Sequence, residues 1–263
     1  MESLIIAKIG GSVIENEDLS AQFLRDFAAL RRKKILVHGG GRSATDLAES
    51  LGIEVRMVEG RRITDREMLR VVTMVYGGLI NKNVVSALQA HHCNAIGLTG
   101  ADANIIPAYK REVGDIDYGF VGDFDAVNPE HLLRFLEMGL TPVLAPLTHD
   151  QRGTLLNTNA DTITASVSIA LATHYETHLY FCFEKSGVLE RMEDEDSLIP
   201  ELSREKYEQL KAGGQIASGM IPKLDNGYQA LHQGVQSVVI CHAGDVGRLQ
   251  SDESEMFGTR ITL

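Results

Sequence analysis

The sequence predicts an α/β fold with a mainly parallel central sheet that is covered by helices on both faces. Short apolar runs of β-favouring residues alternate with longer stretches of helical spacing along all 263 residues, and parallel strands need such helical crossovers. In addition, 44% of the residues are hydrophobic, which is enough apolar material for one large domain or two adjoining lobes.

The elements follow one another in a regular order. The first strand is an apolar run at 4–9 that ends at a glycine pair, and Phe23 and Phe27 lie at helical spacing in the stretch after it. Further strands are expected at 34–37, 94–98, 141–145, 179–183 and 237–241. Helices are expected at 18–32, 43–51, 68–90, 129–138, 161–172, 204–212 and 222–233.

Two segments interrupt this order. Residues 107–128 are predicted to form a hairpin, because glycines punctuate β-compatible residues there. Residues 190–200 are acidic, Glu193 among them, and are predicted to form a solvated loop. No low-complexity linker separates the two halves, so a single domain is expected over 1–263, with a change of role near residue 150.

Charge and cysteine content exclude several classes of protein. The formal net charge is -11, which argues against a surface for nucleic acid or anionic membrane but leaves room for a small anionic substrate. Cys93, Cys182 and Cys241 are odd in number and far apart. They therefore indicate reduced thiols in a cytoplasmic protein, with neither disulfides nor a cysteine metal site. We expect no signal peptide and no stretch long enough to span a bilayer.

Two glycine-containing turns follow the first two strands. Lys8 stands in the first apolar run just before Gly10 and Gly11. A lysine there is costly unless its ammonium reaches a partner, and ligands bind at the carboxyl ends of parallel strands. The glycines 39–41 follow the second strand and precede a helix, so their N–H groups can approach an anion. A snorkelling edge lysine and a flexible turn remain the alternatives.

Three further motifs combine polar residues with the start of a helix. Arg61 and Arg62 precede Thr64. One interpretation is that Thr64 is a helix N-cap and forms a capping box with the glutamate three residues later. Such a cap would account for the threonine but not for the two arginines, which are suited to binding a carboxylate. Asp161 opens the helix at 161–172, where the helix dipole by itself favours a carboxylate. Lys223 lies near the start of another helix, where the dipole disfavours a cation unless an anion shares the site.

Together, and in this order, the motifs resemble the amino-acid kinase family, and within it the acylglutamate branch that includes the N-acetylglutamate kinases. The resemblance covers nearly the whole chain. It rests on K-I-G-G-S from Lys8, V-H-G-G-G from Val37, G-R-R-I-T from Gly60, G-F-V-G-D and V-N-P-E within 119–130, N-T-N-A-D from Asn157, G-M-I-P-K from Gly219 and G-T-R-I from Gly258.

The resemblance implies an open αβα sandwich of about eight strands. An N-terminal lobe, about 1–150, would bind the acylated amino acid, and a C-terminal lobe, about 151–263, would bind ATP. Lys8 and Lys223 would contact the transferring phosphoryl group, and Asp161 would orient both lysines. Mg²⁺ would be held mainly by ATP oxygens and water, with no metal ligands from the protein. The implied substrate-binding residues are Gly40, Gly41, Arg62 and Asn157, and the implied phosphate- or nucleotide-binding residues are Gly10, Gly11, Gly39 and Gly219.

The chain departs from the family pattern at two positions. Glu184 stands where the family commonly has an aspartate after the strand at 179–183, and we keep it as a nucleotide-binding candidate. Arg61 stands where the family usually has an apolar residue. We therefore consider that Arg61 binds an extra carboxylate on the acyl group, which would make N-succinylglutamate a substrate. A solvent-facing arginine is the alternative.

The expected function is ATP-dependent phosphorylation of the side-chain carboxylate of an N-acyl-L-glutamate, an early step of arginine biosynthesis. Arginine-inhibited members carry an extra helix before the first strand. Here that strand begins near residue 4, so we expect a homodimer without arginine feedback. The alternatives are a kinase of another carboxylate or carbamate on the same fold and a non-catalytic amino-acid sensor.

Overall fold

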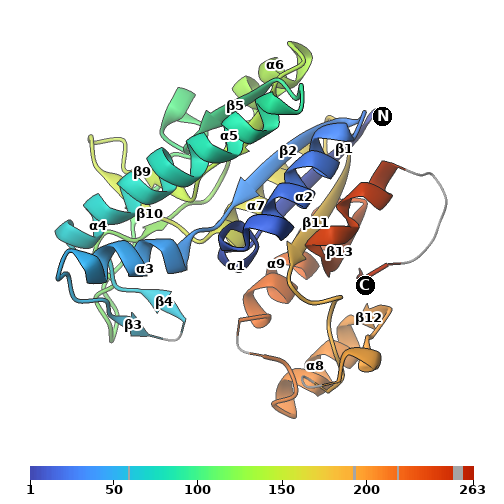
Figure 1. Ribbon diagram of the computed structural model, residues 1–263. Helices are drawn as coiled ribbons and strands as arrows, with labels where there is room; N and C mark the ends of the chain where they lie inside the picture. The colour runs from blue at the N-terminus through green and yellow to red at the C-terminus, as the bar shows by residue number, and fades with distance from the viewer. Residues whose placement is uncertain (59, 192–193, 218, 251–256) are drawn as a thin grey trace.

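The structure, a computed structural model, describes residues 1–263 except 59, 192–193, 218 and 251–256 (Figure 1). Glu193 of the predicted acidic loop therefore lies outside the described residues. The predicted α/β class is confirmed, because eight strands form one sheet in the order β12-β14-β13-β11-β1-β2-β8-β5. These strands are β1 (Ser3–Ile9), β2 (Lys33–His38), β5 (Ala95–Leu98), β8 (Thr141–Leu144), β11 (Glu176–Phe183), β12 (Glu201–Ser203), β13 (Ser237–His242) and β14 (Thr259–Thr262).

The sheet is mainly parallel, as predicted. Strands β13, β11, β1, β2, β8 and β5 run in one direction, and β14 is antiparallel to β13. The helical segments are α1 (Gly11–Glu15), α2 (Glu17–Ala29), α3 (Gly41–Ser50), α4 (Arg66–Val72), η1 (Thr73–Ile80), α5 (Asn81–Ala90), η2 (Asp102–Asn104), α6 (Glu130–Glu137), α7 (Ala160–Leu171), η3 (Glu195–Ser197), α8 (Arg204–Ala212), α9 (Ile221–His232) and η4 (Ala243–Gln250).

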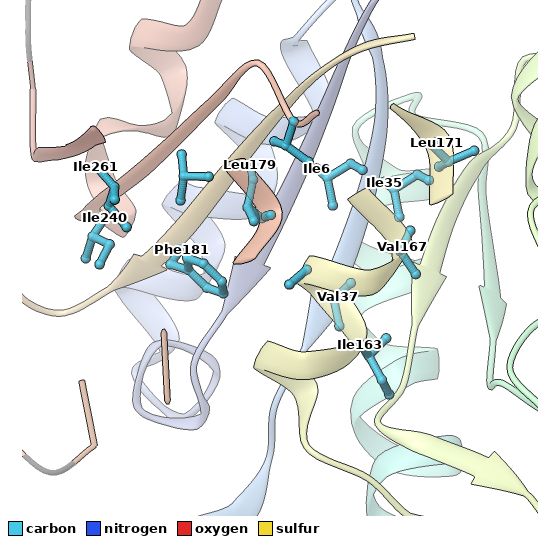
Figure 2. Packing of buried hydrophobic residues seen from close by; sticks show 14 of the residues in the cluster. Ile6, Ile35, Val37, Ile163, Val167, Leu171, Leu179, Phe181, Ile240 and Ile261 are labelled. Carbon is cyan, nitrogen blue, oxygen red and sulfur yellow. The ribbon is translucent and has the colours of Figure 1, made fainter. Parts of the chain in front are cut away.

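Two hydrophobic cores lie on opposite faces of the sheet. Helices α7 and α9 pack together over one face, and α2, α5 and η4 pack over the other. Leu4 and Ile6 of β1 belong to the α7 side, whereas Ile5 and Ala7 belong to the α2 side, because side chains alternate along a strand. Figure 2 shows the α7 side, where side chains of α7 lie against those of β1 and β2. Lys8 continues the series of Leu4 and Ile6 and is therefore directed toward α7.

The helix predicted at 68–90 is longer and less regular than expected. It runs from Arg66 to Ala90, and its central part, η1, is a π-helix between α4 and α5. By length and composition this stretch could cross a membrane, which we did not expect from the sequence. Core helices of globular proteins pass the same test, and 44% of its most apolar window is buried in the structure.

Among the residues that the structure describes, three small hairpins lie outside the central sheet. The hairpin predicted within 107–128 is present as β6 (Tyr109–Lys110) and β7 (Gly122–Asp123). Two others were not predicted: one pairs β3 (Met57–Val58) with β4 (Arg61–Arg62), and the other pairs β9 (Leu147–His149) with β10 (Leu155–Asn157).

The predicted N-cap role of Thr64 is wrong. Helix α4 begins at Arg66, and its cap is Asp65, whose carboxylate accepts a hydrogen bond from Met68 N at 2.8 Å. Thr64 is instead buried in a β-bridge to Gly119, and its hydroxyl donates to the Arg62 carbonyl at 3.2 Å. The cap was misplaced by one residue because threonine and aspartate are both good caps.

Candidate active site

Three neighbouring parallel strands bring the glycine-containing turns to one edge of the sheet. In the β1–β2 and β1–β11 pairs, Ile9 is aligned with His38 and with Cys182. Gly10, Gly39 and Glu184, which follow shortly after these positions, are therefore neighbours in space although they are far apart in the sequence.

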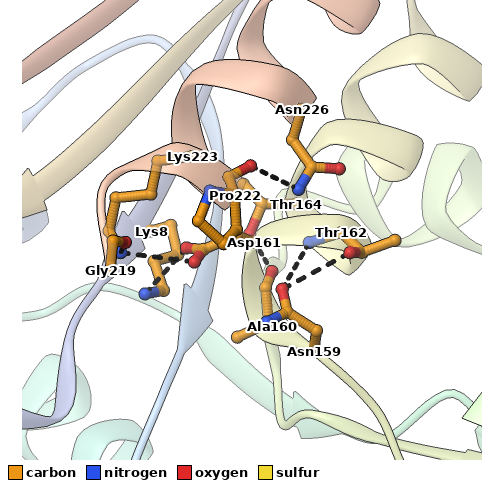
Figure 3. Close-up of polar contacts among 10 residues, drawn as sticks. All are labelled: Lys8, Asn159, Ala160, Asp161, Thr162, Thr164, Gly219, Pro222, Lys223 and Asn226. Carbon is orange, nitrogen blue, oxygen red and sulfur yellow. Dashed lines mark hydrogen bonds and ion pairs between the residues drawn. The ribbon is translucent and has the colours of Figure 1, made fainter. Parts of the chain in front are cut away.

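The two predicted lysines meet the predicted aspartate at this edge (Figure 3). Lys8 Nζ lies 2.8 Å from Asp161 Oδ1, and Lys223 Nζ lies 3.3 Å from Asp161 Oδ2. Lys223 also donates to the carbonyl of Gly219 at 3.1 Å. Asp161 is held in the first turn of α7, whose cap is Asn159, and that side chain accepts from Thr162 N at 3.0 Å.

Burial and charge oppose each other in this cluster. Burial raises the pKa of Asp161, but Lys8 and Lys223 lower it by more, so the pKa lies below its ordinary value. The pKa of Lys223 is lowered, first by burial and also by Lys8, although Asp161 opposes this. Two ammonium groups face one carboxylate, so the cluster carries a surplus positive charge that an anionic ligand would balance.

The glycines of both turns come into close contact. Gly40 has a φ of 149°, and a Cβ there would lie 2.3 Å from Ile80 Cδ1, so the position requires glycine. A Cβ on Gly11 would lie 3.5 Å from Gly41 N. Within the described part of the chain, the backbone N–H groups of Gly40 and Gly41 donate to no acceptor, and Gly41 is the first residue of α3. These N–H groups are therefore available to an anion.

A cavity of about 430 Å³ opens beside the lysines. Its lining includes Lys8, Gly11, Glu184 and Lys223 as well as the apolar Val188, Leu189, Ile216 and Met220. The exposed carboxylate of Glu184 accepts a 2.5 Å hydrogen bond from Ser12 Oγ. This combination of charged, glycine and apolar lining residues suits a nucleotide.

A second cavity, of about 240 Å³, is lined by the glycines 39–41, Arg61, Arg62 and Asn157. Arg62 is buried, and its Nη2 donates to Gly41 O at 2.7 Å and to Thr45 Oγ1 at 2.8 Å. Asn157 Nδ2 donates to Thr64 Oγ1 at 3.0 Å. Arg61 is exposed at the rim.

The structure also places two residues in this second cavity that we did not single out from the sequence. Tyr76 comes from η1, and Arg111, from the segment between β6 and β7, forms two hydrogen bonds to Asp123, at 2.8 and 2.6 Å. Neither residue belongs to a glycine turn or a helix start, so no local pattern marks them. In the described part of the chain, no group of three or more His, Cys, Asp or Glu side chains is placed to hold a metal ion.

Comparisons with known proteins agree with the predicted resemblance. The sequence matches the amino acid kinase family over residues 3–242. The chain belongs to the amino acid kinase family. It is 53% identical over 262 residues to an acetylglutamate kinase from Cytophaga hutchinsonii, covering 99% of both chains. It is 55% identical over 246 residues to an acetylglutamate kinase from Parabacteroides distasonis, covering 94% of this chain and 96% of the relative.

Solved structures of this family's fold are similar to the chain along almost its whole length. N-acetylglutamate synthase from Neisseria gonorrhoeae, complexed with coenzyme A and N-acetyl-glutamate, superposes with a TM-score of 0.82 at 22% identity, over 99% of this chain and 59% of that one. A protein from Streptococcus mutans, smu.665, superposes with a TM-score of 0.77 at 25% identity, over 98% of both chains. The expected fold and the expected family of kinases are thus confirmed, whereas the roles of the individual residues remain predictions.

Proposed function

We propose that this protein uses ATP to phosphorylate the side-chain carboxylate of an N-acyl-L-glutamate, and that its main substrate is N-acetylglutamate. One observation carries the proposal: Asp161 pairs with Lys8 and Lys223, which line the larger cavity, while its neighbour Ala160 lines the smaller one. The name shared by the similar acetylglutamate kinases supports this choice of substrate.

The proposed reaction needs positioning and charge more than acid–base chemistry. A carboxylate is already ionised at neutral pH, so no general base is required. One of its oxygens attacks the γ-phosphorus of ATP, a new P–O bond forms, and the bond to the bridging oxygen of ADP breaks. Lys8 and Lys223 balance the charge on the phosphoryl oxygens, and the N–H groups of Gly40 and Gly41 donate to them. Asp161 holds both lysines in place.

We assign one substrate to each of the two cavities. In our proposal ATP occupies the larger cavity, which is lined mainly by residues after 150, with Gly10, Gly11, Glu184 and Gly219 near its phosphates. The acylated amino acid occupies the smaller one, where Arg62 and Asn157 bind its α-carboxylate. Mg²⁺ would be held mainly by ATP oxygens and water and would neutralise phosphate charge, because the nearby carboxylates are engaged by Lys8, Lys223 and Ser12.

The proposal also concerns which acyl groups the substrate can carry. Arg61 is exposed at the rim of the smaller cavity, where a second carboxylate on a longer acyl chain could reach it, so N-succinylglutamate is proposed as a further substrate. Arg61→Ala should lower kcat/KM for succinylglutamate by about two- to fivefold, the scale of one exposed ionic contact, and leave kcat/KM for acetylglutamate almost unchanged. Equal losses on both substrates would remove Arg61 from acyl recognition.

We also propose that the enzyme acts in arginine biosynthesis in the cytoplasm. An acyl phosphate of N-acetylglutamate is an early intermediate of arginine biosynthesis, and all three cysteines are buried free thiols, as suits a cytoplasmic protein. The gene should therefore restore growth without arginine to a strain that lacks its acetylglutamate kinase. Continued need for arginine despite expression of folded protein would contradict this setting.

The deciding experiment is an acyl-phosphate assay with hydroxylamine trapping. ATP and Mg²⁺ are supplied with acetylglutamate, succinylglutamate, free glutamate and, separately, carbamate. We expect hydroxamate from the acylated glutamates and ADP release in equal amount. Absence of turnover with both acylglutamates would overturn the proposal, and preferred turnover of carbamate or free glutamate would assign another kinase activity. Binding without turnover would favour the sensor.

A further inference from the structure

The side chains of Lys82, Asn81 and His38 form a chain of hydrogen bonds next to the glycine turn, here called the relay. The proposed mechanism does not use it. His38 is the last residue of β2 and is 0% exposed, and Asn81 is the first residue of α5 and is 1% exposed. Buried polar side chains are costly unless they are hydrogen-bonded. Both side chains meet this requirement, because each is hydrogen-bonded through both of its polar atoms.

The contacts fix the direction of every hydrogen bond in the relay. Lys82 Nζ lies 3.0 Å from Asn81 Oδ1, and an ammonium can only donate, so this oxygen is the acceptor. Asn81 Nδ2 then donates to Val143 O at 3.0 Å and to His38 Nε2 at 3.2 Å. His38 Nδ1 lies 2.8 Å from Gly39 O, which can only accept. The imidazole must therefore carry its hydrogen on Nδ1.

The imidazole is also held neutral. The pKa of His38 is lowered to about 4, mainly by burial and also by the charges of Lys8 and Lys82, while the bond to Gly39 opposes these effects. A neutral ring with one donor and one acceptor matches its two partners, whereas a charged ring would place a second N–H against the donor of Asn81. His38 is thus suited to orienting a neighbour and unsuited to transferring protons near neutral pH.

The group that His38 orients is the peptide between Gly39 and Gly40. A trans peptide is planar, so fixing its carbonyl oxygen also fixes its N–H, which points to the opposite side. The N–H of Gly39 is separately tied to Ile9 O at 2.9 Å. Three consecutive glycines have little conformational preference of their own, so the turn depends on such outside contacts for its shape.

We propose that His38 and Asn81 are positioning residues that, through the bond from His38 to Gly39 O, hold the Gly40 N–H group in the orientation required by the transferring phosphoryl group. This inference rests on the proposed function. It assigns the histidine of the V-H-G-G-G motif a task that is separate from the glycines themselves. Helix α5 thereby contributes to the site without touching a ligand.

The test compares two substitutions of His38. His38→Leu keeps the volume and removes both hydrogen bonds, while the amide of His38→Asn can still donate to Gly39 O from near the place of Nδ1. We expect His38→Leu to lower kcat about 10- to 100-fold, the range for misplaced catalytic donors, with both KM values changed less than about threefold. His38→Asn should recover most of the loss, and Asn81→Leu should resemble His38→Leu. His174→Leu, at an exposed position, is the control.

The kinetics and stability of the His38 variants decide whether this side chain positions the turn. It is overturned if folded His38→Leu keeps a kcat within about twofold of wild type, or if His38→Asn loses as much kcat as His38→Leu and both unfold at equally lowered temperatures. Should neither variant fold, ¹⁵N NMR of the wild-type imidazole decides, because a hydrogen on Nε2 instead of Nδ1 contradicts the relay. Wild-type protein is assayed in parallel, so a lack of wild-type turnover rejects the proposed function, while normal wild-type turnover with unaffected variants rejects only this inference.

Discussion

A single carboxylate balances two ammonium groups at the site. Asp161 lies in the first turn of α7 and reaches Lys8 from β1 and Lys223 from α9. Its lowered pKa means that the folded state favours the ionised form. The stabilisation it contributes is therefore present above the unfolded-state pKa and is lost as the pH falls through the lower folded-state value. Asp161 is therefore ionised near neutral pH and pairs with both lysines.

Asp161→Asn keeps the shape of the side chain and removes its charge. We expect kcat to fall at least about 100-fold, because both lysines lose the group that orients them. Unfolding free energy should fall by about 3 kcal/mol, as for breaking a buried ion pair from one side. Steady-state kinetics and urea unfolding measure the two effects. Asp194→Asn, which alters an exposed pair with Arg191, should change neither, and an equal effect there would refute the assignment.

Burial of His38 makes a separate prediction about acid stability. Its pKa is about 4 in the folded state and near 6.5 when unfolded. Between these values the unfolded state binds more protons, so stability falls as the pH decreases through that window. The contribution is roughly 3 kcal/mol between pH 7.5 and 4. Urea unfolding of wild type and His38→Asn over this range should show a smaller decline in the variant, and parallel curves would contradict it.

The glycine turn at 39–41 and the π-helix η1 pack against each other and form one structural unit. Tyr76 and Ile80 of η1 both lie against Gly40, and Asn81, which follows directly, is hydrogen-bonded to His38. A π-helix often marks a functional site, and here it places two side chains against the turn that carries the proposed phosphate donors. The shape of the turn therefore depends on a helix from elsewhere in the chain.

Gly40→Ala tests this dependence. A Cβ would lie 2.3 Å from Ile80 Cδ1 at a φ of 149°, so we expect a loss of about 1–3 kcal/mol of stability and a fall in kcat of about 100-fold or more. Gly78→Ala is the matched control, since a Cβ there meets nothing within 4 Å in the same helix. It should leave kcat unchanged and keep or raise the melting temperature. Full activity of Gly40→Ala would show that the turn tolerates another shape.

The residues that could be predicted from sequence are those whose position follows from topology. Lys8 and the glycines 39–41 had to share an edge once their strands were taken as parallel, because the carboxyl ends of such strands lie together. His38 and Asn81 are 43 residues apart, and neither spacing nor propensity relates them. Likewise the π-helix has the same apolar pattern as an α-helix, and the strands of β3–β4 are only two residues long, too short to show alternation.

The molecule as a whole exposes apolar side chains along its longest helix. Met74 and Leu79 are 50% and 56% exposed, and both belong to η1, where residues five apart are hydrogen-bonding neighbours and so share a face. An exposed apolar patch on a globular protein commonly marks an interface. We propose that this face joins two copies of the chain in the homodimer that the family resemblance implies.

The dimer is tested by changing this face alone. Met74→Glu with Leu79→Glu should convert a dimer of the wild-type chain into a monomer, because paired copies would bury four carboxylates without partners. Light scattering and sedimentation measure the mass, and circular dichroism verifies the fold. Met138→Glu, at a methionine that is 72% exposed on another surface, is the control and should remain dimeric. A wild-type monomer or hexamer would reject the dimer itself. A double variant that stays dimeric would place the interface elsewhere, since two copies cannot keep those charges in a dry contact.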